Sequence, residues 1–169
     1  MILPKRGLVL LALIALTAGP ASAATRLGAP APAFDVKTLA GDHIDLAGMR
    51  GKVVILTFWA TWCAPCREEL AALETYYEKH HPEGLEIIAI NQDDPDNAKT
   101  VGKLMASFHF TGAFDSQANY DKYGRISELP VSVVIDRDGV VRADSRIGAW
   151  VFDGPRLEAT VTPLLAAKP

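Results

Sequence analysis

Short apolar runs, each followed by a polar turn segment, recur along most of the chain. Residues 53–59 (VVILTFW) are almost all apolar and branched or aromatic, and the run is too short for a helix. Such a run is typical of a strand that is covered on both faces, so we predict a central strand here. Residues 85–90 form a second run of this kind and predict a second buried strand.

Helical spacing follows the first of these runs. Four positions recur at intervals of four, three and four residues and so share one helix face: Cys66, Leu70, Leu73 and Tyr77. The HHPEG sequence at residues 80–84 is expected to end this helix. Asp94 as the N-cap, followed by a proline, predicts a second helix that runs to about residue 108. A last helix is predicted over residues 155–167, with Pro163 weakening its middle.

Turn signals predict two hairpins. Residues 34–36 and 43–46 flank a glycine-aspartate turn, and residues 131–135 and 140–143 flank the tight turn DRDG. Each pair of short strands can therefore fold back on itself in antiparallel fashion.

Between the second helix and the second hairpin, residues 113–115 are predicted to form a short strand and residues 118–123 a short helix. The order along the chain is then alternating strands and helices, followed by a hairpin and a helix. Such an order predicts an α/β fold in which a mixed sheet has helices on both faces.

The first residues have the features of an export signal. Lys5 and Arg6 precede an uninterrupted apolar stretch over residues 8–18, and the tripeptide ASA then provides the small residues that signal peptidase recognises. We therefore predict a cleaved signal peptide over residues 1–23 and one domain over residues 24–169, located in the periplasm or otherwise exported. If retained, the apolar stretch would act only as a loose anchor, because a spanning helix needs roughly 20 residues.

Charge and cysteine content exclude several classes of protein. The formal net charge is -3 and the pI is near 5.8, whereas nucleic-acid binding needs a concentrated excess of Lys and Arg. We therefore expect no nucleic-acid partner. The chain has two cysteines, which are too few for a disulfide-stapled scaffold in an oxidising compartment.

Those two cysteines, Cys63 and Cys66, form a CxxC pair directly after the predicted central strand. Two intervening residues in a first helical turn put the α-carbons near the ~5.5 Å that a disulfide prefers. Unpaired backbone N–H groups and the positive end of the helix dipole favour the thiolate there, and Pro65 is tolerated at a helix start. Cys63 is therefore expected to have a lowered pKa.

The two thiols are expected to play unequal parts. Cys66 belongs to the apolar helix face, whereas Cys63 is expected at an exposed tip. Cys63 is thus predicted to attack a partner disulfide, and Cys66 to resolve the mixed disulfide that results. This exchange requires no cofactor.

Two other interpretations of the pair are possible. A structural disulfide would close so small a loop that it would restrict the unfolded chain very little. A metal site would need two further ligands, and we predict none because the histidines are scattered and far from the pair in sequence: His43, His80, His81 and His109.

Residues 54–66 (VILTFWATWCAPC), followed by REEL, resemble the active-site segment of the TlpA/ResA branch of thioredoxin-like proteins. The similarity extends over most of the chain after the leader, and residues 133–139 resemble the family's LIDRDG element. It implies a thioredoxin-like α/β fold, with a central mixed sheet of four or five strands flanked by helices and an N-terminal β-hairpin extension.

The same resemblance implies a function and partners. Members of this branch are dithiol reductants that are periplasmic or face the membrane. The implied partners are proteins with disulfides, such as apocytochrome c or copper-centre assembly proteins, and a membrane-bound electron donor of the DsbD/CcdA type. We expect the protein to be a monomer.

By this resemblance Pro130 has the position of the cis-proline that faces the dithiol. A cis bond there would place the preceding backbone where a substrate chain can pair with it, so Leu129 would help to set substrate preference. Trp62, beside the dithiol, would shield it or contact partners. The following Val131-Ser132 departs from the threonines that relatives often carry.

Glu69 corresponds to an acidic residue that this branch carries near the thiols. A half-buried carboxylate there would have a raised pKa and could exchange a proton with Cys66. The alternative is a solvated helix carboxylate like Glu68. Thr57 stands where thioredoxin has a buried aspartate and cannot take over its proton transfer.

Four functions compete at this point. A disulfide reductase is favoured, because Ala64-Pro65 between the cysteines lacks a basic residue that would strongly stabilise the thiolate. A disulfide donor of the same fold would run the exchange in the opposite direction. A copper carrier that is not an enzyme would use a wider cysteine spacing and a distal histidine. A thiol peroxidase is a weaker candidate still.

Overall fold

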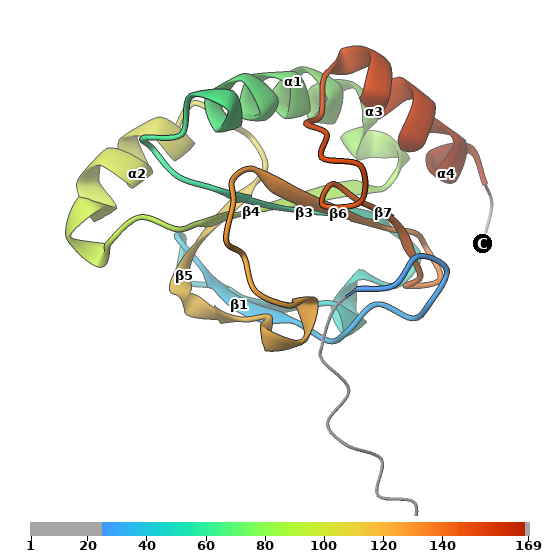
Figure 1. Cartoon of the computed structure of the whole chain (residues 1–169), viewed down its shortest axis with the longest axis horizontal. Coiled ribbons are helices and arrows are strands. Elements are labelled where there is room, and N and C mark those ends of the chain that lie inside the picture. Colours follow the sequence, from blue (N-terminus) through green and yellow to red (C-terminus); the bar gives the residue numbers. More distant parts are fainter. Residues whose placement is uncertain (1–24, 168–169) are drawn as a thin grey trace, which may run out of the picture.

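Seven strands form one mixed sheet in the order β2-β1-β5-β4-β3-β6-β7 (Figure 1). The computed structural model describes residues 25–167, so the predicted signal peptide over residues 1–23 lies outside the described part. The strands are β1 (Asp35–Thr38), β2 (His43–Asp45), β3 (Val53–Trp59), β4 (Leu85–Asn91), β5 (Thr111–Asn119), β6 (Val131–Ile135) and β7 (Val141–Asp144). The α-helices are α1 (Ala64–His80), α2 (Ala98–Met105), α3 (Gly154–Thr160) and α4 (Thr162–Ala166). No helix among these residues is long and apolar enough to cross a membrane.

β3 is the central strand that the apolar run predicts. All seven of its residues are buried. It pairs in parallel with β4 on one side and antiparallel with β6 on the other. Successive side chains alternate between two cores, so that Ile55 joins one and Leu56 the other. The chain leaves the end of this strand directly toward the two cysteines.

All four α-helices pack on one face of the sheet, which is the upper face in Figure 1. The opposite face is covered by residues from the segment around β1 and β2 and from a short 3-10 turn before β6, including Phe34, Leu46 and Tyr123. The prediction of helices on both faces is therefore wrong. These non-helical segments carry enough large apolar side chains to cover the second face without a helix.

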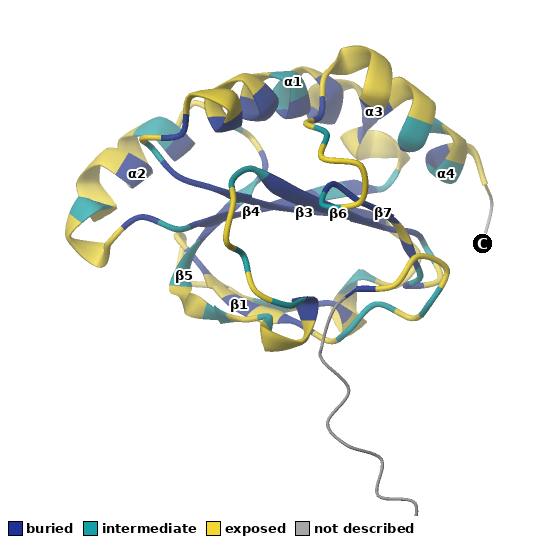
Figure 2. Cartoon of the chain, viewed as in Figure 1, coloured by how far each residue is buried: buried dark blue, intermediate teal, exposed yellow. Residues whose placement is uncertain are grey.

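α1 presents to the sheet the face that the spacing predicts. The four residues of that face are all buried, and Figure 2 shows buried residues on the inner side of the helix and exposed ones outside. The helix ends at His80, and a 3-10 turn (His81–Glu83) leads to Gly84. Gly84 has a φ of 92°, which glycine adopts without strain, and this turn sends the chain back into β4.

The region predicted as a short helix at residues 118–123 is mostly strand. β5 is longer than the predicted 113–115, and only Asp121–Tyr123 forms a 3-10 turn. The last two residues of β5 pair with β1. Local propensity cannot reveal this partner because β1 is distant in sequence. β1 also pairs with β2, which confirms the predicted hairpin. The hairpin thus extends the sheet to seven strands, beyond the four or five expected.

Two predicted helices differ in extent. α2 follows a 3-10 turn (Pro95–Asn97) that Asp94 caps, and it ends at Met105 rather than near residue 108. The C-terminal helix is divided into α3 and α4, with Val161 between them. Pro163 has no N–H to continue the hydrogen-bond ladder of α3, which explains the division.

Candidate redox site

The two cysteines lie at the start of α1 and are joined by a disulfide, with their Cα atoms 5.3 Å apart. Cys63 is the N-cap residue, with an extended backbone, and Pro65 lies in the first turn. The backbone N–H of Cys66 donates to the Sγ atom of Cys63, at 3.3 Å. A thiolate on Cys63 in the reduced protein would accept the same hydrogen bond, which stabilises a negative charge on this sulfur.

Cys66 is more deeply buried than Cys63, as predicted, but Cys63 is far more buried than predicted. Cys66 has no exposed surface, and Cys63 is 5% exposed. The expectation of an exposed tip at Cys63 is therefore wrong, because this residue packs into the hydrophobic core on the helical face of the sheet. Trp62 is the exposed residue at this point, at 70%. A partner can reach the disulfide only through the small open area at Cys63.

Glu69 lies one helical turn after Cys66, and it is buried rather than half-buried, with 1% exposure. Thr57 Oγ1 and Ser132 Oγ donate to its Oε1 atom, and the backbone N–H of Phe152 donates to its Oε2 atom at 3.0 Å. Burial raises the pKa of Glu69, although these three hydrogen bonds oppose the shift. The carboxyl group can therefore take up a proton at a higher pH than an exposed glutamate.

Thr57 and Ser132 were expected only as departures from related sequences, and their part in this network was missed. The two residues lie opposite one another where β3 pairs with β6. Each is a polar residue in an otherwise apolar strand. This pattern is the signal that could have revealed their part in the network. Phe152 contributes through its backbone, which no sequence pattern reveals.

Asp93 is a second buried carboxylate that the sequence reasoning assigned no role. It receives hydrogen bonds from Thr61 twice, through the backbone N–H at 2.7 Å and through Oγ1 at 2.5 Å. Asn91 and Asn97 donate to it as well, at 2.7 and 2.8 Å. Burial alone would raise its pKa, but these hydrogen bonds outweigh that effect and lower it.

The consequence of the Asp93 contacts is a fixed loop before the helix. Thr61 lies within the turn in which the N–H of Cys63 donates to the carbonyl of Ala60, at 3.1 Å. The carbonyl of Thr61 accepts from Arg67, at 2.8 Å. Every polar group of Thr61 is thus bound, and the backbone that leads into Cys63 is held in place by Asp93.

Two of the three predicted substrate residues, Trp62 and Leu129, line a groove beside this loop, and Pro130 follows Leu129 directly. The Leu129–Pro130 bond is cis, as the resemblance predicts. Trp62 and Leu129, far apart in sequence, line the same groove of about 610 Å³. The other lining residues are Gln92, Ile126, Ser127 and Glu128.

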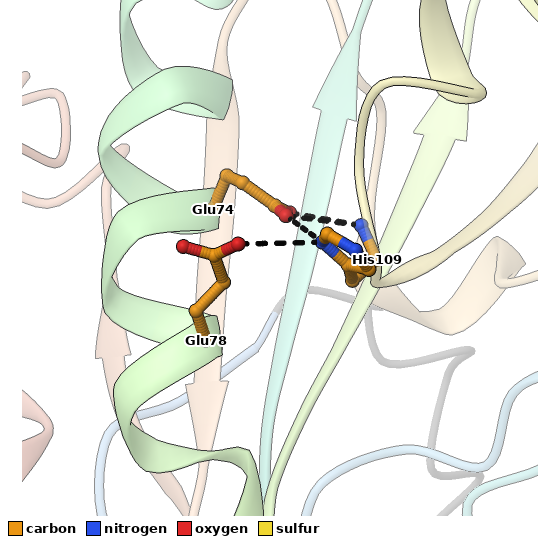
Figure 3. Close-up of side chains that lie close together, drawn as sticks. All are labelled: Glu74, Glu78 and His109. Carbon is orange, nitrogen blue, oxygen red and sulfur yellow. Dashed lines mark hydrogen bonds and ion pairs between the residues drawn. The ribbon is translucent and has the colours of Figure 1, made fainter.

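A separate cluster of possible metal ligands lies away from the cysteines. Glu74 and Glu78 project from α1 toward His109, which follows α2 (Figure 3). Glu74 accepts hydrogen bonds from both the backbone and the ring of His109, and His109 and Glu78 are exposed. These contacts form an ion pair that links α1 to the loop between α2 and β5. We assign no metal to this cluster.

Comparisons with known proteins agree with this geometry. Residues 27–144 match the family described as AhpC/TSA. The chain belongs to that family. It is 37% identical, over 115 residues, to the thiol-disulfide oxidoreductase ResA of Bacillus thuringiensis subsp. konkukian, a match that covers 68% of this chain and 66% of that protein. The chain thus spans about two thirds of the length of this relative.

Two further matches support the fold. The thioredoxin-like protein YneN of Bacillus subtilis is 32% identical over 126 residues, which are 72% of this chain and 71% of that protein. The crystal structure of a thiol:disulfide interchange protein of the thioredoxin family from Chlorobium tepidum superposes with a TM-score of 0.69 at 23% identity, covering 85% of this chain and 100% of that one. The predicted thioredoxin-like α/β fold and the resemblance to the TlpA/ResA branch are confirmed.

Proposed function

We propose that this protein is an exported thiol-disulfide oxidoreductase that reduces disulfides in partner proteins. The observation that carries the proposal is the Cys63–Cys66 disulfide at the start of α1, in which Cys63 keeps a small exposed area and Cys66 has none. The relatives named thiol-disulfide oxidoreductases support this class of activity. The predicted leader over residues 1–23 supports export to the periplasm or a similar compartment.

The reaction starts from the reduced protein. The Cys63 thiolate attacks one sulfur of the partner disulfide, so that a bond forms between Cys63 and the partner while the partner's own S–S bond breaks. The released partner thiolate takes a proton. Cys66 then attacks the Sγ atom of Cys63, the mixed disulfide breaks, and the second partner thiolate leaves and is protonated. Two electrons and two protons reach the partner, and the Cys63–Cys66 disulfide remains.

Glu69 has the position and the chemistry to accept the proton of Cys66. A buried thiol is a poor nucleophile until it loses its proton, and Glu69 is the buried carboxyl group one helical turn after Cys66. Burial raises the pKa of Glu69. The difference between the pKa of this carboxyl group and that of a thiol is therefore smaller, and transfer of a proton from Cys66 to Glu69 is easier. We therefore assign Glu69 as the base for the resolving step.

The groove between Trp62 and Leu129 is the proposed substrate site. The cis bond before Pro130 turns the backbone of Leu129 at the entrance to β6. A substrate chain can then lie along this backbone with its disulfide at Cys63. Apocytochrome c and copper-centre assembly proteins are candidate partners, and a membrane-bound donor of the DsbD/CcdA type is the candidate source of electrons that returns the dithiol to its reduced form.

Insulin-disulfide reduction with dithiothreitol as the electron source tests the activity. We expect the wild-type protein to accelerate the reaction and Cys63→Ala to abolish the acceleration. Glu68→Gln, which changes an exposed carboxylate near the cysteines, is the matched control and should retain full activity. Full activity in the Cys63 variant would contradict the proposal.

The reduction potential decides the direction of exchange. A value near ~-270 mV is that of a reductant such as thioredoxin, whereas ~-120 mV is that of a strong disulfide donor. We expect a value near the first, because no basic side chain stands between the cysteines. A value near the second would make the protein a disulfide donor instead.

A further inference from the structure

The substrate groove has a chemical character that distinguishes between partner segments. Its apolar surface comes from the indole of Trp62 and from the partly buried Ile126 and Leu129. Gln92 and Ser127 are neutral. Glu128 is the single charged residue among the six that line it, it is exposed, and it forms no ion pair within residues 25–167. An occupant of the groove would therefore meet one free negative charge.

The exposed face of Trp62 favours the same kind of occupant. An indole face attracts Lys and Arg side chains through its π-electrons, and this indole is 70% exposed. Arg67, the basic residue closest in sequence, donates to the carbonyl of Thr61 and does not line the groove. Two groups at the groove thus attract a cation, and none of its lining residues repels one.

The surroundings of the groove do not offset this charge. A neighbouring hollow shares Ile126 with the groove and contributes two carboxylates, Asp115 and Asp121, against one guanidinium, Arg125. The local excess of charge is therefore negative on both sides of the shared residue. Such a field attracts positively charged segments and slows the approach of acidic ones.

The backbone beside the groove is free to hold an extended chain. Within the described part of the protein, the N–H and C=O groups of residues 126–128 form no hydrogen bonds with other residues. They lie just before the cis bond at Pro130. An extended segment can pair with them, and its cysteine would then stand next to Cys63, with flanking side chains over Trp62 and Glu128.

We propose that Glu128 and Trp62 select partner segments in which a lysine or arginine lies within a few residues of the disulfide-bonded cysteine. This inference rests on the proposed function and names the substrate class of the same site. The occupant is an extended, positively charged segment of a partner protein. Acidic or neutral segments react by the same chemistry but more slowly.

The test uses the full chain, reduced beforehand, and two disulfide-bridged peptides that differ only in having Lys or Glu two residues from the cysteine. Each dithiol reduces one peptide disulfide, so the rate is that of the exchange itself. Because an exposed charge pair contributes ~0.2–1 kcal/mol, we expect the Lys peptide to react roughly 1.4-fold to fivefold faster at low salt. The difference should shrink at high salt, which screens exposed charges.

Variants identify the residue responsible. Glu128→Gln should remove most of the preference and Glu128→Lys should reverse it, whereas Glu68→Gln, an exposed carboxylate outside the groove, should leave it unchanged. Preference for the Lys peptide that persists in Glu128→Lys would overturn the inference, as would equal rates for both peptides in the wild type. Failure to reduce either peptide would instead contradict the proposed function.

Discussion

Glu69 is a buried acid whose hydrogen-bond partners are two hydroxyls and one backbone N–H rather than a cation. Its pKa is raised by burial from an ordinary value of 4.5. The folded protein therefore binds this proton more tightly than the unfolded chain does. The ionised side chain thus lowers stability, and this effect grows as the pH rises above 4.5 toward the raised folded pKa.

Glu69→Gln should reveal that effect. The amide has the shape of the acid but does not ionise, so its free energy of unfolding relative to the wild type should increase from pH 4 to pH 8. Urea unfolding at several pH values measures the difference, with Glu68→Gln as the exposed control. The same variant should resolve a mixed disulfide roughly 100-fold more slowly, because it has no base for Cys66. A difference in stability that is constant with pH would contradict the assignment.

Asp93 contacts the segment before Cys63 through Thr61, so we predict that it affects the cysteines through this contact. Substitutions of the two residues test this prediction. Thr61→Val removes the hydroxyl group of Thr61 and keeps the charge on Asp93. Asp93→Asn removes that charge and places an NH₂ group where the carboxylate accepts hydrogen bonds from N–H and O–H donors. Both should loosen the loop and weaken the hydrogen bond to the Cys63 sulfur. We expect alkylation of Cys63 at neutral pH to slow by about threefold in both variants.

The alternative is a direct effect of the Asp93 charge on the thiolate. In that case Asp93→Asn would speed alkylation of Cys63, since a nearby negative charge would be lost, and Thr61→Val would change little. Asp96→Asn, an exposed carboxylate in the same loop, is the control for charge alone. Thr61→Ser should restore the wild-type rate because it keeps both hydrogen bonds to Asp93.

At the scale of the elements, Arg137 in the β6–β7 turn forms hydrogen bonds with the backbone of three other segments of the chain. Its guanidinium donates to the carbonyls of Gly51, Glu83, Leu165 and Ala167, at 2.6 to 3.1 Å. These carbonyls belong to the approach to β3, to the 3-10 turn after α1, and to the end of α4 with the residue after it. One side chain therefore holds the C-terminal helix against the sheet.

Arg137→Met should lower the free energy of unfolding by about 2–3 kcal/mol, because several carbonyls lose a charged donor. The free energy of unfolding of Arg137→Lys should lie between those of Arg137→Met and the wild type, since lysine keeps the charge but not the planar guanidinium group. Urea unfolding gives the values. Arg125→Met, which removes an exposed guanidinium that has no hydrogen bond within residues 25–167, should change stability little.

α1 is also tied to the loop before β5 through His109 and Glu74 (Figure 3). Hydrogen bonding and charge from Glu74 raise the pKa of His109 above 6.5. The protonated pair therefore stabilises the fold below the unfolded pKa, and this contribution is lost as the pH rises through the folded pKa. His109→Gln should be less stable than the wild type at pH 6 and equal to it at pH 9.

Thermal unfolding at both pH values checks this ion pair. His43→Gln, which changes an exposed histidine whose side chain has no hydrogen bond or ion pair in the described part, is the matched control and should show no such dependence. A deficit in His109→Gln that is the same at pH 6 and pH 9 would show that the ion pair does not stabilise the fold.

At the scale of the whole molecule, the sequence predicts those features that depend on neighbouring residues. The strand β3, the helix α1 and the cysteine pair all lie within residues 53–80, and periodicity, capping and spacing define them. Glu69 and the cis bond at Pro130 came from the family resemblance instead. Features that depend on distant pairing were not predictable, such as the length of β5 and the partners of Glu69.

The errors have the same physical origin. Cys63 was expected to be exposed because it precedes a helix, yet its burial depends on what the rest of the fold places over it. Asp93 was assigned no role, because its contact with Thr61 joins segments that are 32 residues apart and leaves no local signal in the sequence. Burial and long-range hydrogen bonds follow from the assembled sheet, whereas local patterns define the elements that assemble.

The central claim is that Cys63 attacks the partner and Cys66 completes the exchange. Trapping measures it most directly: reduced Cys66→Ser and Cys63→Ser proteins are mixed with a disulfide-bridged peptide, quenched with an alkylating reagent and analysed by mass spectrometry. We predict that the Cys66 variant accumulates a mixed disulfide through Cys63, and that the Cys63 variant accumulates none. A mixed disulfide that forms as readily through Cys66, or in neither variant, would contradict the account.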